Sequence, residues 1–144
     1  MKRLLLPLLA GIAALAQVPS VRSVYILPMA GGLDQYLAAE LTREHSMQVV
    51  ADPKAADAVL TDRLGESFEQ KMTQIHPRDK DDVAENSAHP SFRSSGSRGT
   101  IFLVDSKSRQ VLWSDYEKPT RSASSGSLNR EAARIAKKLA ARSK

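Results

Sequence analysis

The side chains best suited to chemistry in this 144-residue sequence are three histidines and many serines. A serine hydrolase brings a serine, a histidine and a carboxylate together, so that the histidine accepts the hydroxyl proton. The candidates are His45, His76, His89 and the Ser95-Gly96-Ser97 segment. However, the sequence lacks a G-x-S-x-G motif, and Ser95-Gly96-Ser97 lies in a long polar stretch that would position a nucleophile poorly. We therefore expect no enzyme, and the alternative is a small hydrolase that uses a loop serine or His45.

Metal and phosphate binding have equally weak support. His76 and His89 are separated by a polar stretch and lack the helical or hairpin spacing of zinc ligands. The chain contains no cysteine, which excludes disulfides, thiolate zinc sites, thiol catalysis and lipid attachment through a cysteine. Gly31-Gly32 precedes a predicted helix, where backbone N–H groups can bind anions, but the further glycines and the Lys-Ser/Thr pair of a phosphate loop are absent. We expect a turn at Gly31-Gly32, no metal and no cofactor.

A basic cluster near the carboxyl terminus is the candidate interaction surface. Its members are Arg130, Arg134, Lys137, Lys138 and Arg142. With Lys144, and against Glu131 alone, they give residues 130–144 a net charge of +5. Binding to nucleic acid is not expected, because the chain has few aromatic residues for base stacking. The alternatives for this face are an acidic protein partner, an anionic lipid surface, or solvent alone.

The amino terminus has the pattern of a secretory signal peptide. Two basic residues precede an apolar run over residues 4–15, and the small residues Ala14 and Ala16 flank a cleavage point. A membrane-spanning helix needs about 20 apolar residues, so a membrane anchor is the weaker interpretation. We predict cleavage between Ala16 and Gln17, which leaves a periplasmic or secreted protein of residues 17–144.

The apolar pattern of residues 17–144 predicts a single α/β (α+β) domain with one mixed sheet of about five strands. Apolar and β-branched runs indicate strands, whereas apolar residues three and four apart indicate helices. Strands are predicted over residues 21–29, 47–50, 58–61, 100–105 and 110–116, and helices over 33–41, a short turn from 53, 66–75 and 128–139. The last two strands should form an antiparallel hairpin, and the first two should be parallel because a helix connects them.

The hairpin and the last helix are expected to share a core. Its predicted members are Ile101, Leu103, Val111, Trp113, Leu128, Ile135 and Leu139. Residues 76–98, in contrast, show no apolar periodicity. Because they offer little apolar surface to offset the backbone entropy of ordering, they are predicted to be a mobile polar insertion.

Several segments resemble small bacterial cell-envelope domains, a group that includes the amino-terminal domain of TolB and periplasmic domains related to the curli-secretion protein CsgG. The segments are Val49-Val50-Ala51-Asp52-Pro53, Ala56-Asp57-Ala58-Val59-Leu60, Leu103-Val104-Asp105 and Gln110-Val111-Leu112-Trp113-Ser114. The chain departs from the group in lacking a lipidation cysteine, and Ser108-Arg109 stands where the hairpin turn commonly has glycine. The resemblance implies an exported, non-enzymatic envelope domain that acts through protein-protein contacts with another envelope protein.

Overall fold

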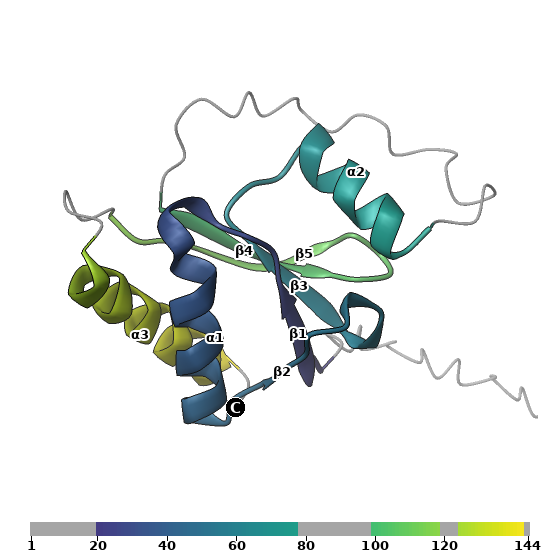
Figure 1. Ribbon diagram of the computed structural model, residues 1–144. Coiled ribbons are helices and arrows are strands. Elements are labelled where there is room, and N and C mark those ends of the chain that lie inside the picture. The colour runs from purple at the N-terminus through teal and green to yellow at the C-terminus, as the bar shows by residue number, and fades with distance from the viewer. Residues whose placement is uncertain (1–19, 78–98, 119–123, 143–144) are drawn as a thin grey trace, which may run out of the picture.

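A computed structural model describes residues 20–77, 99–118 and 124–142. Over these residues the chain forms one mixed five-stranded sheet with helices on both faces (Figure 1). The predicted α+β class and the single mixed sheet are therefore confirmed. Two predicted segments lie outside the described residues: the signal peptide, residues 1–16, and residues 78–98 of the polar insertion.

The helices and strands follow the predicted order. The strands are β1 (Ser23–Ile26), β2 (Gln48–Val49), β3 (Ala58–Thr61), β4 (Thr100–Asp105) and β5 (Val111–Tyr116), and the α-helices are α1 (Leu33–Glu44), α2 (Glu66–Ile75) and α3 (Ser125–Arg142). Short 3₁₀ turns lie at Ala30–Gly32 and Pro53–Ala55. Strand β1 is shorter than its prediction because Pro28, which has no N–H for a ladder, and a glycine turn follow it.

The strands lie in the order β2-β1-β3-β4-β5. Strand β1 is parallel to both β2 and β3, whereas β4 is antiparallel to β3 and to β5. The parallel β1–β2 pair joined by α1 and the β4–β5 hairpin both agree with the predicted connections. Two strands form the edges of the sheet: β2, which has two residues, and β5, which has six.

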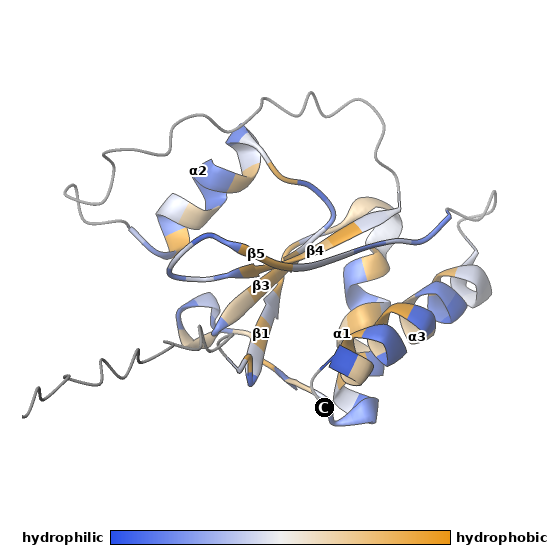
Figure 2. Cartoon of the chain, turned by 180° about the vertical axis from the view of Figure 1, so that it is seen from behind, coloured by the Kyte–Doolittle hydropathy of each residue, from blue (hydrophilic) through white to orange (hydrophobic). Residues whose placement is uncertain are grey.

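Alternating side chains along the strands build two separate cores, because successive residues of a strand point to opposite faces. On one face α1 and α3 cover a core that includes Val24, Leu60, Ile101, Leu103, Leu37, Leu41, Ile135 and Leu139. On the other face α2 covers Leu27, Val59 and Val104 with Phe68 and Met72. Figure 2 shows hydrophobic strands at the centre and hydrophilic outer surfaces on α2 and α3.

Most of the predicted shared core is confirmed. Ile101, Leu103, Ile135 and Leu139 are fully buried, and the half-buried Trp113 and Leu128 pack against them. Val111 is the exception, because it is 47% exposed. The register of β4 and β5 shifts between the pairs Leu103–Trp113 and Val104–Val111, so that Leu112 is an extra residue.

This β-bulge turns Val111 to the α2 face, away from Trp113. The prediction that Val111 and Trp113 share a buried face is therefore wrong. The prediction assumed that side chains alternate strictly between the two faces of the sheet. That alternation holds only where no extra residue is inserted into a strand.

Arg109 connects the β4–β5 turn to the end of α2. Its backbone has a φ of 64°, the left-handed conformation that explains why glycine is common at such a position. The buried guanidinium donates hydrogen bonds from Nη2 to the carbonyl oxygens of Met72, at 2.9 Å, and His76, at 2.8 Å. These contacts attach the turn to the carboxyl terminus of α2, where basic side chains commonly hydrogen-bond to the last carbonyl groups; Met72 O also accepts from His76 N at 2.7 Å.

The packing of α3 on the sheet yields a stability prediction. Ile135 is fully buried in the core that α1 and α3 share. Ile135→Ala should lower the free energy of unfolding by about 2–5 kcal/mol, because it leaves a cavity. Lys137→Ala, at an exposed position of the same helix, is the matched control and should change it by less than about 0.5 kcal/mol. Urea unfolding of both variants measures this, and equal effects would contradict the assigned helix phase.

Candidate functional site

The structure separates the five predicted basic residues of α3 into two groups. Arg134 and Lys138 bind carboxylates on and just after β5. The other three lie elsewhere on α3: Arg130 and Lys137 are exposed, and Arg142 is half-buried. Two of the five charges are thus paired with carboxylates of the protein itself, although both side chains stay about half exposed, and the basic interaction surface stays a prediction.

Arg134 and Lys138 form an ion cluster with Asp115 and Glu117. Lys138 Nζ lies 2.6 Å from Asp115 Oδ2 and 2.6 Å from Glu117 Oε1, and Arg134 Nε lies 3.2 Å from Glu117 Oε2. This ion cluster fastens the carboxyl-terminal end of β5 to α3. Since α3 is itself packed on the core, this ion cluster fixes the end of β5 to the face of the sheet that α3 covers.

The ion cluster shifts the pKa values of its members. The hydrogen bond from Lys138, aided by that from Arg134, holds the pKa of Glu117 below its ordinary value. The hydrogen bonds to Asp115 and Glu117 raise the pKa of Lys138. In contrast, burial raises the pKa of Glu131, three residues before Arg134 on α3, and the nearby Glu117 adds to that increase.

These directions predict a pH-dependent effect on stability. Because the pKa of Glu117 is lower in the folded chain, its ionised carboxylate adds to the free energy of unfolding above the unfolded pKa of about 4.3. That contribution is lost as the pH falls through the pKa of the folded chain. Glu117→Gln should therefore lower the free energy of unfolding at pH 7 by up to about 1 kcal/mol. The difference in unfolding free energy between the wild type and this variant should be largest at pH 7 and smaller at about pH 3, because the carboxyl group is progressively protonated as the pH falls.

Glu131→Gln is the matched control, because the pKa of Glu131 is raised whereas that of Glu117 is lowered, so its charge has the opposite effect on stability. Removing this charge should leave stability at pH 7 unchanged or higher. Urea unfolding at the two pH values measures both variants. A loss for Glu117→Gln that is equal at both pH values would contradict the role given to the ion cluster.

Strand β5 offers one side of its backbone to solvent. Glu117 N donates to Gly99 O at 2.8 Å, and Asp105 N donates to Gln110 O at 2.9 Å, so Gln110 and Glu117 point toward β4. Because hydrogen-bonding direction alternates along an antiparallel strand, the backbone groups of Val111, Ser114 and Tyr116 point away from β4. No strand among the described residues pairs with that outer side.

The same three residues also present exposed side chains. Val111 is 47% exposed and Tyr116 is 61% exposed, and they are the exposed large hydrophobic residues of the described chain. Val111, Ser114 and Tyr116 lie opposite Val104, Phe102 and Thr100, respectively. Val104 and Phe102 pack on the α2 side, and opposite residues share a face. Val111, Ser114 and Tyr116, called the β5 edge below, therefore form one strip on the α2 face.

Strand β5 carries only part of the protection that edge strands usually have against pairing. Proteins commonly block edge strands with lysine, proline, inward-pointing charges or a β-bulge, and β5 has the bulge at Leu112. The sequence of β5 contains neither lysine nor proline, and its one charged residue, Asp115, is bound by Lys138. This site was missed from the sequence, because exposure of one strand edge depends on the order of strands in the sheet.

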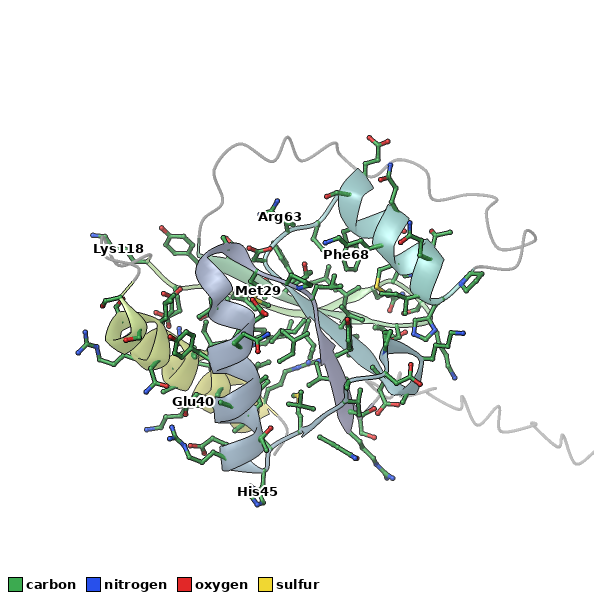
Figure 3. The ribbon with its side chains drawn as sticks, viewed as in Figure 1. Met29, Glu40, His45, Arg63, Phe68 and Lys118 are labelled. Atoms are coloured by element: carbon green, nitrogen blue, oxygen red, sulfur yellow. The ribbon has the colours of Figure 1, made fainter. Side chains whose placement is uncertain are left out.

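The histidines considered for catalysis have local structural roles. His45 follows α1, far from the loop of Arg63 (Figure 3), and its Nδ1 lies 2.9 Å from the carbonyl oxygen of Arg43. His76 follows α2, and its Nε2 lies 2.9 Å from the carbonyl oxygen of Pro53. Both of these ring contacts are to backbone carbonyl oxygens rather than to a serine hydroxyl or a carboxylate. His89 and Ser95-Gly96-Ser97 lie outside the described residues.

The loop before α1 uses its N–H groups within the fold. Met29 N donates to Asp34 Oδ1 at 3.0 Å, and Ala30 N donates to Asp62 Oδ2 at 2.9 Å. Gly31 and Gly32 follow with φ values of 71° and 77°, which glycine adopts without steric cost. Two N–H groups of this loop thus bind carboxylates of the protein itself, as expected of a structural turn.

A small cavity lies between the ends of β1 and β3 and the start of α2. Its volume is about 60 Å³, and its polar lining comes from Thr61, Arg63, Ser67 and Lys71. This volume is small beside the roughly 300–1,000 Å³ of typical small-molecule sites.

Comparisons with protein-family models, curated proteins and solved structures found no match for this chain. Across residues 20–77, 99–118 and 124–142, no group of three or more metal-binding side chains is placed to hold an ion. None of the helices in these ranges is long and apolar enough to span a membrane. The geometry of the β5 edge is therefore the basis on which a function can be argued.

Proposed function

We propose that this protein is an exported, non-enzymatic cell-envelope domain that acts through protein-protein contacts made at the β5 edge. The observation that carries the proposal is a six-residue edge strand that holds Val111 and Tyr116, the two exposed large hydrophobic side chains of the residues that the structure describes. Such a strand can add an extended polypeptide segment to the sheet, a common mode of peptide recognition.

The backbone and the side chains of the β5 edge would make different contributions to binding. The outward N–H and C=O groups of the β5 edge would hydrogen-bond to an added strand of almost any sequence, which supplies affinity. Val111, Ser114 and Tyr116 would contact alternate side chains of that strand, which supplies selectivity. Burial of Val111 and Tyr116 would add hydrophobic stabilisation to these hydrogen bonds.

The surrounding contacts support this role, because they hold β5 in an extended form before any partner binds. The hydrogen bonds of Arg109 fasten the turn before β5 to α2. The ion cluster of Asp115, Glu117, Arg134 and Lys138 fastens its other end to α3. A strand that is already ordered loses less conformational entropy on binding than a flexible segment. The signal-peptide pattern at the amino terminus supports an envelope location for the partner.

Site-specific photo-crosslinking tests the proposal in cells that produce and export the full chain. A photoreactive phenylalanine analogue replaces Tyr116 at the β5 edge or, as a matched control, the exposed Gln74 on α2. Irradiation should give a polypeptide adduct from position 116 and little from position 74, because a bound strand would lie against Tyr116. Absence of an adduct at 116, or equal adducts at both positions, would contradict the proposal.

A further inference from the structure

We infer that the strand added at the β5 edge is β5 of a second copy of this chain, so that two copies form one continuous sheet. This inference rests on the proposed function and names the partner for the same strand. The copies would be related by a two-fold axis, since that symmetry makes two identical strands antiparallel. Three features of β5 match this arrangement: its backbone register, the placement of its exposed side chains and its charge.

The first respect is the pairing of outward backbone groups. With the two-fold axis at Ser114, this residue lies opposite Ser114 of the second copy. Leu112 and Trp113 form the bulge and together occupy one position, opposite Asp115 of the second copy. Val111 then lies opposite Tyr116 of the second copy, so every outward-pointing residue of the β5 edge meets another outward-pointing residue.

The second respect is the placement of the exposed apolar side chains. Val111 and Tyr116 stand at opposite ends of β5 but on the same face of the sheet. Antiparallel pairing brings the start of one strand to the end of the other, so each Val111 would meet a Tyr116 across the interface. The interface would thus bury all four exposed side chains in two symmetric aromatic–aliphatic pairs, the kind of cross-strand pair that stabilises sheets. Without the bulge, Val111 would lie on the other face and these pairs would not form.

The third respect is charge. Asp115 is the one charged residue within β5, and in this register it lies opposite the uncharged Leu112-Trp113 bulge of the second copy. Moving the axis by one residue, to Asp115, would preserve outward pairing between Ser114 and Tyr116 but would place two aspartates directly opposite each other. Like charges in that position destabilise a strand pair. The charge pattern therefore favours the register centred on Ser114.

Disulfide trapping tests both the partner and the register, because the natural chain contains no cysteine. Ser114→Cys places two thiols on the axis, with Cα atoms about 5.5 Å apart in a hydrogen-bonded pair, a Cα distance that a disulfide can span. The full exported chain with Ser114→Cys should form a disulfide-linked dimer under mild oxidation. Tyr116→Cys is the matched control and should stay unlinked, since the two introduced thiols would lie about four residues apart along the strands.

Light scattering after size-exclusion chromatography tests the unmodified interface. The wild-type chain should have twice the mass of one copy at high concentration and dissociate on dilution. Ser114→Pro removes an N–H that points away from β4, so the sheet should fold normally while dimers are lost; Ser114→Ala keeps this N–H and should dimerise. If Ser114→Pro fails to fold by circular dichroism, Val111→Lys decides, because Val111 is already exposed and a lysine there should also abolish the dimer.

The outcomes separate this inference from the proposed function. A wild-type chain that is monomeric at every concentration, together with a Tyr116 adduct to a different protein, would overturn the self-pairing and leave the contact role of β5 standing. A monomer with no Tyr116 adduct would overturn both. A disulfide dimer from Tyr116→Cys as readily as from Ser114→Cys would overturn the register, and a dimer that persists in Val111→Lys would place the interface elsewhere.

Discussion

The register shift between β4 and β5 is the constraint on which the surface of this protein depends. One inserted residue allows Leu112 and Trp113 to pack against the core under α1 and α3, while Val111 turns to the opposite face. The bulge satisfies two demands at once, because it fills the large core and leaves an apolar residue at each end of one strand face. Bulges are common at sheet edges, where they re-aim a side chain or terminate pairing.

The position of β5 is maintained by polar contacts at its two ends rather than by a neighbouring strand on its outer side. At the turn, Arg109 has a backbone conformation with positive φ, and its guanidinium donates hydrogen bonds to the carbonyl oxygens of Met72 and His76 at the end of α2. At the other end, Lys138 and Arg134 of α3 hold Asp115 and Glu117. These two anchors come from helices on opposite faces of the sheet. An edge strand held in this way is both extended and accessible, and addition of a further strand requires both properties.

The electrostatics of α3 show why charge counted along a sequence is a poor guide to a surface. The five basic residues predicted to form an interaction face share one helix, but Arg134 and Lys138 point to carboxylates on the β5 side. Glu131, which the sequence places among these cations, is buried, and its pKa is raised mainly by burial. Helix periodicity therefore locates the apolar stripe of α3 well, whereas the pairing of its charges depends on which strand lies beneath the helix.

The sequence by itself determined the helices and strands, the mixed sheet and most of the core. Local apolar periodicity carries that information, as the burial of Ile101, Leu103, Ile135 and Leu139 shows. Tertiary structure alone decided that β5 is an edge, that Val111 leaves the core, and that Lys138 binds Asp115 and Glu117. The physical reason is that strand order, register and ion pairing arise between segments far apart in the chain. A spacing pattern within one segment reports which side chains can be buried, but it does not report what lies beside them.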